Sequence, residues 1–336
     1  TYCDDKGLLE LGDAEVSSGR SEGQPVLTLR SSMADAHVRG IFLPTLLPKA
    51  FRNVVFSVFP ALSEQVEYVQ EEQYFDFNIE LKAIDSLLNR LVPGLSAGAG
   101  ATFEGGFDSR TFDLSLGAVL PHFTYGAIKG DSVTLFLDKT LDVLAFSARS
   151  DRQHLTASTY LTGIDITGKA YQDEVRLTMG WGGSSGGTHG KLDLRGLVNG
   201  PTDVEIDLLP SELHFGLGSW KSQGTTRLHY ANDELLVDSL RMRNGEERVE
   251  IEGILSKDPE KAIGFLLDGV RLDHLRPFYA GPSLHGTVSG DGRLFDAFGE
   301  PYLLSYICLD SLRVADKPVG DIKFAASWHD GRREMD

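Results

Sequence analysis

The sequence has few cysteines and no long apolar run. Its 336 residues include only two cysteines, Cys3 and Cys308, too few for a disulfide framework or a cysteine-based zinc site. A bond between them would join the two ends of the chain, so we expect two unrelated small residues. No run of about 18 apolar residues occurs, which excludes a membrane-spanning helix. The opening residues, TYCDDKG, do not form a signal peptide.

Positive charge is also scarce. The chain carries 32 Lys and Arg against 49 Asp and Glu, for a net charge of -17. Proteins that bind nucleic acid need clustered Lys and Arg to neutralise phosphates. The composition therefore excludes nucleic acid as a partner, and the chain as a whole is repelled by anionic surfaces.

Catalytic and metal-binding motifs are missing. The run GWGGSSGG at 180–187 fits GxSxG at Ser184 and Ser185, but that motif needs a helix directly after the serine, and the following KLDLRG is typical of a strand. As a dinucleotide loop it lacks the third glycine. None of the nine histidines shows metal-ligand spacing such as HExxH. We expect no catalytic residue, metal site or cofactor, and a protein that is not an enzyme.

What the sequence does contain is the alternation of β-strands. Apolar residues alternate with small or polar ones, and turn signals recur every eight to twelve residues. The clearest stretches are 26–30, 36–42, 75–81, 102–117, 133–137, 175–182, 204–217, 249–255 and 284–330. Asn244-Gly245 is a strong signal for a two-residue hairpin turn. The pattern predicts a mainly β chain of short antiparallel strands.

A few segments depart from this pattern. Residues 1–25 resemble an irregular lead-in or a frayed edge. Residues 43–60 suit either a short amphipathic helix or, through Val54, Phe56 and Val58, a strand. Apolar residues at 84, 87, 88 and 91 share one helical face, which Pro93-Gly94 ends. His274–Ala280 suits one helical turn.

An Asp-Ser pair followed by alternating residues recurs at Asp131, Asp238 and Asp310. The spacings differ, which excludes a fixed-period solenoid. Degenerate repeats of one β-meander and chance both explain the echo. At each place we expect the pair beside a turn, where a strand begins or ends.

Three blocks resemble the AsmA-like superfamily, and their order along the chain resembles its TamB (translocation and assembly module) proteins. They are GTTRLHYANDELLVDSLRMRNGEERVEIEGILSKDP from Gly224, the tail that begins LHGTVSGDGRLFDAFGEPYLL, and FDFNIELKAIDSLLNRLVPGLSAGAGATFEGGF. The resemblance covers roughly residues 70–336. It implies an elongated antiparallel sheet curled into a U-shaped trough, a β-taco, with an apolar concave side and one or two short helices. The corresponding domains are a lead-in at 1–70 and a continuous trough at 71–336.

The resemblance also implies a function. Family members are anchored in the inner membrane of Gram-negative bacteria, cross the periplasm, support outer-membrane biogenesis and are linked to phospholipid transport between the membranes. This chain would be an interior periplasmic piece, without the anchor or the segment that meets an outer-membrane barrel partner. Its expected ligand is the acyl chains of phospholipids. The residues expected to line the groove are Phe103, Leu114, Leu135, Met179, Trp181, Phe215, Leu217, Ile251, Leu267 and Phe324, with Trp181 and Trp328 at the rim.

Other interpretations stay open. A scaffold or chaperone would hold unfolded outer-membrane strands by edge pairing. A carbohydrate-binding β-sandwich would need an exposed aromatic platform, and Trp181, Trp220 and Trp328 lie far apart in the sequence. From the pattern alone, an ordinary sealed core also explains the apolar stripes. Which stripe of a strand faces inward is open as well, because a slip of one residue would exchange the two faces of the strand.

Overall fold

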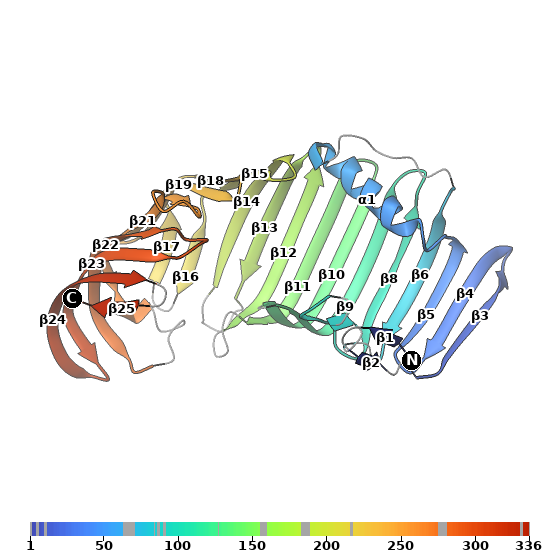
Figure 1. Ribbon diagram of the computed structural model, residues 1–336, viewed down its shortest axis with the longest axis horizontal. Helices are drawn as coiled ribbons and strands as arrows, with labels where there is room; N and C mark the ends of the chain where they lie inside the picture. The colour runs from blue at the N-terminus through green and yellow to red at the C-terminus, as the bar shows by residue number, and fades with distance from the viewer. Residues whose placement is uncertain are drawn as a thin grey trace. The chain divides into compact units, whose positions relative to one another are not determined.

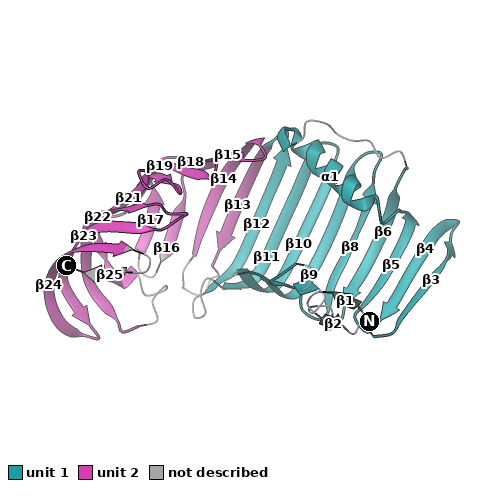
Figure 2. Ribbon diagram, in the orientation of Figure 1, with its two compact units in different colours: residues 1–173 teal, residues 174–336 magenta. Residues whose placement is uncertain are grey.

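The computed structural model describes residues 2–4, 7–9, 12–62, 71–83, 85, 88–89, 92–126, 128–154, 160–182, 189–215, 218–274, 281–329 and 332–335. The expected fold class is confirmed: the chain is mainly β and antiparallel, with one α-helix, α1 (Leu47–Val58), and one short 3-10 helix, η1 (Pro60–Leu62), in the part described. The chain divides into two compact units, residues 1–173 and 174–336 (Figure 2).

Unit 1 is an antiparallel sheet in the order β3-β4-β5-β6-β8-β9-β10-β11-β12, with β7 paired to the end of β9. Figure 1 shows its strands side by side. The bounds are β1 (Tyr2–Asp4), β2 (Gly7–Leu9), β3 (Ala14–Ser21), β4 (Gln24–Ser31), β5 (Ala34–Ile41), β6 (Tyr74–Leu81), β7 (Leu95–Ser96), β8 (Ala101–Asp108), β9 (Asp113–Tyr125), β10 (Ile128–Thr140), β11 (Val143–His154) and β12 (Tyr160–Tyr171). Strands β1 and β2 pair with each other.

Helix α1 covers one end of the apolar face of unit 1 (Figure 1). Ala50 and Val54 pack on Phe75 of β6 and Phe107 of β8. At the C-terminal end of α1, the carbonyl of Val58 accepts a hydrogen bond from the amide of Asp173, at 3.1 Å. A second cluster, of Ala34, Leu81, Ala97, Ala101 and Leu120, forms the core at the other end of the strands.

Unit 2 is a second antiparallel meander. Its bounds are β13 (Glu174–Trp181), β14 (His189–Gly200), β15 (Asp203–Leu208), β16 (Glu212–Phe215), β17 (Gly218–Ser222), β18 (Thr226–Ala231), β19 (Glu234–Asn244), β20 (Glu247–Leu255), β21 (Ala262–Arg271), β22 (Leu284–Phe295), β23 (Tyr302–Val314), β24 (Lys317–His329) and β25 (Arg332–Met335). Strands β15 and β16 act as one long strand interrupted at Pro210. Both pair with β14, and they face β18 and β17 respectively.

Backbone pairing runs across the expected domain boundary at residue 70. Strands β5 and β6 lie on either side of it and pair continuously from Ala34↔Leu81 to Ile41↔Tyr74. The N-terminal stretch is not an irregular lead-in, because β3 pairs with β4 along its whole length. The sequence pattern changes near residue 70, but backbone pairing decides which strands belong to one unit.

Two local predictions are settled by the structure. The helical alternative is confirmed for residues 47–58, where Pro48 stands in the first turn. The hairpin at Asn244 is confirmed, but its turn lies one residue later: Asn244 pairs with Glu247, and Gly245 takes φ 62° at the first turn position. Glycine at that position is typical of a type II′ turn.

Other predicted segments fall partly outside the described residues. Of the helix expected at 84–91, Asp85, Leu88 and Asn89 are helical, and the amide of Val92 donates to the carbonyl of Leu88. Of the turn expected from His274, the structure describes only residue 274 itself, which together with residues 272 and 273 is in 3-10 conformation. The glycine-rich run at 183–188 lies outside the described part of the chain.

The three Asp-Ser pairs lie inside strands β10, β19 and β23, not at strand ends as expected. In β19 the register shifts between Val237 and Leu240, and in β23 it shifts between Leu309 and Leu312. These two pairs are therefore β-bulges. Ser132 and Ser311 adopt positive φ, at 50° and 54°. The repeated Asp-Ser pair therefore marks local irregularities of the backbone, which the alternation of apolar residues does not reveal.

Candidate functional site

The register of unit 2 gathers its large apolar side chains on one face of the sheet. Directly paired residues point to the same side, and the row Met242↔Val249↔Leu267 is one example. The same face carries Met179, Leu192, Leu194, Ile206, Leu228, Ile251, Ile263, Phe265, Ile307 and Phe324. We call this surface of β13 to β24 the apolar face of unit 2.

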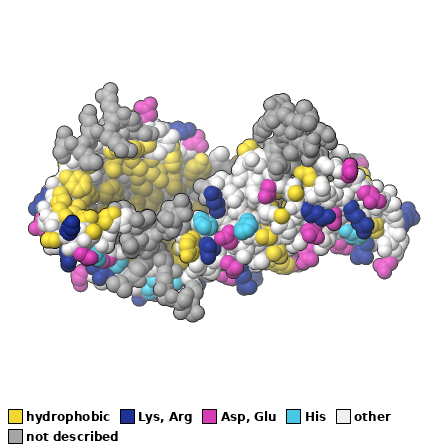
Figure 3. All heavy atoms as spheres, turned by 90° about the horizontal axis from the view of Figure 1, so that it is seen from below, with side chains coloured by type: hydrophobic (Ala, Val, Ile, Leu, Met, Phe, Trp, Pro, Cys, Tyr) yellow, Lys and Arg dark blue, Asp and Glu magenta, His cyan; other side chains and the backbone are white. Residues whose placement is uncertain are grey.

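The apolar face of unit 2 is only half-buried. Trp220, Met242 and Val270 form a buried cluster at one end, but the residues named above along the rest of the face all retain exposed surface. Within the described residues of unit 2, no helix lies over this face. Figure 3 shows the result at the left of the view: a hollow in unit 2 whose walls are hydrophobic side chains.

The opposite face of unit 2 is charged. Arg195 contacts Glu174 at 2.8 Å, Arg227 contacts Asp207 at 3.0 Å, and Arg248 contacts Asp268 at 3.5 Å. Hydrogen bonds from Arg176 and Arg195 lower the pKa of Glu174. Exposed pairs of this kind stabilise a protein by at most about 1 kcal/mol each. They identify this face as the solvated side of the sheet.

The apolar face of unit 1 is more fully covered than that of unit 2. Besides α1, it carries the buried side chain of Lys139, whose ammonium lies 5.9 Å from the centre of the Phe112 ring. Burial lowers the pKa of Lys139. A cation at this position makes the end of the face near α1 a poor surface for a purely apolar ligand.

The residues predicted to line a groove fall on these apolar faces wherever the structure describes them. Phe103, Leu114 and Leu135 lie on the face of unit 1, where the first two are partly buried and pack against its core clusters. Met179, Ile251, Leu267 and Phe324 lie on the face of unit 2. The side chain of Phe215 and the whole of Leu217 lie outside the described residues.

The two tryptophans expected at a rim differ from each other. Trp328, next to the end of β24, is 37% exposed. Trp181 ends β13 but is only 7% exposed, because its ring packs over Gly190 of β14, which has no side chain. The rim position therefore stays a prediction for Trp181, and the sequence does not show that Gly190 would be the partner of its ring.

A buried polar network, which sequence reasoning missed, closes the Trp220 end of the hollow. Glu247 lies 3.0 Å from Nε2 of His274 and accepts hydrogen bonds from the backbone and the guanidinium of Arg271, at 2.9 and 3.0 Å. Asn244 donates to the same carboxylate at 2.9 Å. Burial alone would raise the pKa of Glu247, but the Arg271 amide and His274 outweigh it, and the pKa is lowered.

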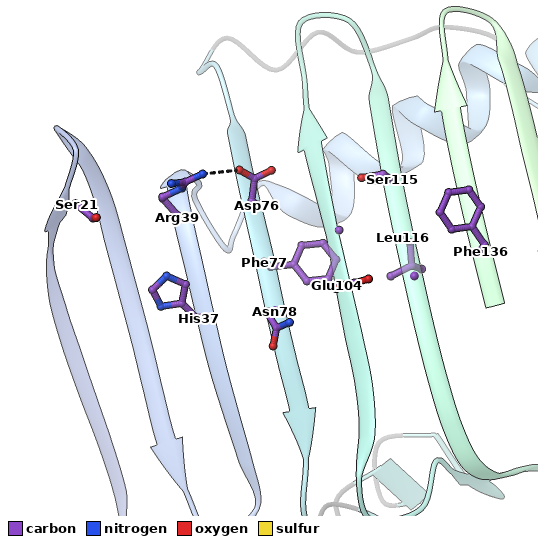
Figure 4. A pocket seen from close by; sticks show the side chains of 12 residues that line it. Ser21, His37, Arg39, Asp76, Phe77, Asn78, Glu104, Ser115, Leu116 and Phe136 are labelled. Atoms are coloured by element: carbon purple, nitrogen blue, oxygen red, sulfur yellow. Dashed lines mark ion pairs between the residues drawn. The ribbon is translucent and has the colours of Figure 1, made fainter. Parts of the chain in front are cut away.

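Unit 1 also carries an open groove of about 540 Å³ on its polar face (Figure 4). His37 and Arg39 of β5, Asp76 and Asn78 of β6, Glu104 of β8 and Phe136 of β10 surround it. Its floor includes Gly105 and Gly117. Two features of the sequence could have indicated this groove. One is the pair of glycines, and the other is Phe136, whose side chain points to the polar face of its strand while Leu135 and Leu137 point to the apolar face.

The remaining chemistry is sparse. In the described part of the chain, no three His, Cys, Asp or Glu side chains are placed to bind a metal ion together. Cys308 is a free, half-buried thiol. No helix among the described residues is both long and apolar enough to cross a bilayer. Ser184 and Ser185 lie outside the described residues.

The chain was compared with known protein families, curated proteins and solved structures. No protein family matches the chain, and neither a curated protein nor a solved structure does.

Proposed function

We propose that this chain shields the acyl chains of phospholipids in the hollow of unit 2. One observation carries the proposal: a long apolar face whose side chains stay half-exposed, with no helix over it in the described residues. Proteins seldom leave a large contiguous apolar surface in water unless it binds a partner, a ligand or a membrane. A polar outer face and an apolar inner face suit a carrier that hides hydrocarbon from water.

The energetics favour such a ligand. Each methylene moved into water costs about 0.8 kcal/mol, so a sixteen-carbon chain faces on the order of 13 kcal/mol. A hollow lined by Ile251, Phe265 and Phe324 removes that cost without a catalytic group or cofactor. The exposed charged pairs on the other face keep the carrier itself in solution.

The resemblance to TamB and AsmA-like proteins supplies the setting of the proposal. In that setting the chain is a periplasmic part of a longer, inner-membrane-anchored protein of a Gram-negative bacterium. It passes phospholipid between the inner and outer membranes and so supports outer-membrane biogenesis. Contact with an outer-membrane barrel assembly protein would involve segments beyond this chain.

Native mass spectrometry of protein purified without detergent tests the proposal. We expect phospholipid to remain bound, and we expect Ile251→Asp and Phe324→Asp to lose it while circular dichroism stays β. The matched control is Leu236→Asp, which puts the same charge on the opposite face of unit 2, where Leu236 is already 41% exposed. Lipid-free wild-type protein, or equal loss of lipid in the control, would contradict the proposal. If both Asp variants unfold, the retention of lipid by wild type and by Leu236→Asp still decides the outcome.

A second candidate function, a scaffold that holds unfolded outer-membrane strands, is favoured by β3. This outermost strand of unit 1 is exposed at all eight residues, and a strand with free backbone groups can pair with another chain. Hydrogen exchange in the presence of an outer-membrane strand peptide tests it. The scaffold predicts new protection of the β3 amides; unchanged exchange there would contradict it.

A further inference from the structure

The polar groove of unit 1, here called the trench, includes Gly117 in its floor. The row Asn78↔Glu104↔Gly117↔Phe136 crosses β6, β8, β9 and β10. Glu104 and Phe136 stand two strands apart in this row, about 10 Å from strand to strand, with only Gly117 between them. The side chain of Glu104 leans over Gly117, where a Cβ would lie 3.4 Å from its Cγ and 3.6 Å from its Oε1, so the trench presents a carboxylate next to an aromatic ring.

The next row of side chains bounds the trench. Gly106 of β8 lies between Asp76 and Ser115 in the register. A Cβ at Gly106 would lie 2.8 Å from Oδ1 of Asp76, too close for a normal contact. The side chain of Asp76 therefore occupies the space above Gly106, and Oγ of Ser115 accepts a hydrogen bond from the Gly106 amide at 3.0 Å, so these two side chains bound the groove here.

The aromatic wall is unusual for its position. Phe136 is 51% exposed on a face where its neighbours in β10 are Thr134 and Asp138. The ring gains little from burial in this place, since half of its surface remains in water. Its flat face, which carries the negative side of the ring quadrupole, is available to stack on the C–H groups of a ligand.

The polar wall offers both kinds of hydrogen-bonding group. Asn78 supplies a donor and an acceptor, and Glu104 supplies acceptors. Arg39 and Asp76, which are paired residues of the adjacent strands β5 and β6, form an ion pair at 3.6 Å (Figure 4), so the arginine is partly neutralised. Two carboxylates with one paired arginine disfavour a phosphate or another anion. The polar floor and walls disfavour an acyl chain.

We propose that this trench binds a neutral saccharide. Saccharides combine hydroxyl groups, which both donate and accept hydrogen bonds, with a flat C–H face that stacks on an aromatic ring, and these are the two features that the trench presents. The platform is Phe136 rather than a tryptophan. The site is independent of the hollow in unit 2, so it adds a second ligand to the lipid proposed above.

Titration of the full chain with cellotriose, maltotriose and chitotriose, followed by saturation-transfer NMR, tests this inference. We expect at least one of them to bind, and we expect Phe136→Ala and Glu104→Gln each to weaken binding at least tenfold. Tyr171→Ala is the matched control, because it removes an aromatic ring of unit 1 that is 44% exposed outside the groove. Absence of binding by all three saccharides, or equal weakening in Tyr171→Ala, would overturn the proposal.

The same experiment separates this site from the lipid site and identifies the source of the saccharide. Ile251→Asp should bind the trisaccharides as wild type does, so failure of either proposal leaves the other standing. A free glycan and the head group of a glycolipid present the same chemistry to the trench. If the trench binds both, nanodiscs that carry a glycolipid with the preferred sugar should compete with the trisaccharide, and this competition should be lost in Phe136→Ala. If the trench binds only a free glycan, the nanodiscs should not compete.

Discussion

Oε2 of Glu247 lies 3.0 Å from Nε2 of His274, a residue that is itself only 6% exposed. The two residues are 27 positions apart, and their contact places a buried charge next to Trp220, whose ring meets His274 edge-on at 5.6 Å. The apolar hollow of unit 2 therefore ends in a polar network rather than in solvent.

Removing that charge should destabilise unit 2. Glu247→Gln keeps the size of the side chain but weakens its hydrogen bonds with Arg271 and His274, at a cost of about 1.5–3 kcal/mol at pH 7. The matched control, Glu246→Gln, changes an exposed neighbour and should cost less than about 0.5 kcal/mol. Urea unfolding measures both, and equal effects would show that the network contributes no stability.

The contribution of Glu247 should depend on pH. Because the folded pKa lies below the ordinary value of 4.5, the carboxylate stabilises the fold fully above about pH 4.5 and loses this effect as the pH falls through the lowered pKa. We expect the difference in unfolding free energy between wild type and Glu247→Gln to shrink as the pH falls below 4.5 and through the lowered pKa. A constant difference over that range would contradict the assignment.

Two adjacent valines of α1 test whether the helix is part of the core of unit 1. Val54 is 5% exposed against Phe75 and Phe107, whereas Val55 is 45% exposed. Val54→Ala removes two buried methyl groups and should cost about 2 kcal/mol, while Val55→Ala should be close to neutral. Hydrogen exchange of β6 and β8 should accelerate in the first variant alone. Similar behaviour in both would mean that α1 does not hold this end of the sheet.

The contact between Trp181 and Gly190 offers a further test. A Cβ at Gly190 would lie 2.4 Å from the indole ring, whereas a Cβ at Gly180 would meet its nearest neighbour at 3.9 Å. Gly190→Ala should displace the ring, cost about 1–3 kcal/mol and shift tryptophan fluorescence to the red. Gly180→Ala, the control, should leave the spectrum unchanged. An unshifted spectrum in Gly190→Ala would show that the ring has room to adjust.

Much of the fold follows from the sequence alone. Alternation at 175–181 and 249–255 fixes which side chains share a face, because the two-residue period of a strand leaves no freedom once the strand forms. The proline and apolar spacing around Leu47 indicate a helix, and Gly245 indicates a turn. All these signals are local, which is why they predict strands, helix α1 and the hairpin.

Long-range pairing decided the rest. Whether an apolar stripe is sealed or left open depends on what lies over it, and only the tertiary structure places α1 over Phe75 and Phe107 while leaving Ile251 and Phe324 half-exposed. The trench needs residues from β5, β6, β8 and β10 in one register, and the contact of Glu247 with His274 joins segments 27 residues apart. The sequence determined the two-sidedness of each strand through its alternation. The tertiary structure decided which sides became core, hollow or groove, because coverage depends on contacts between distant residues.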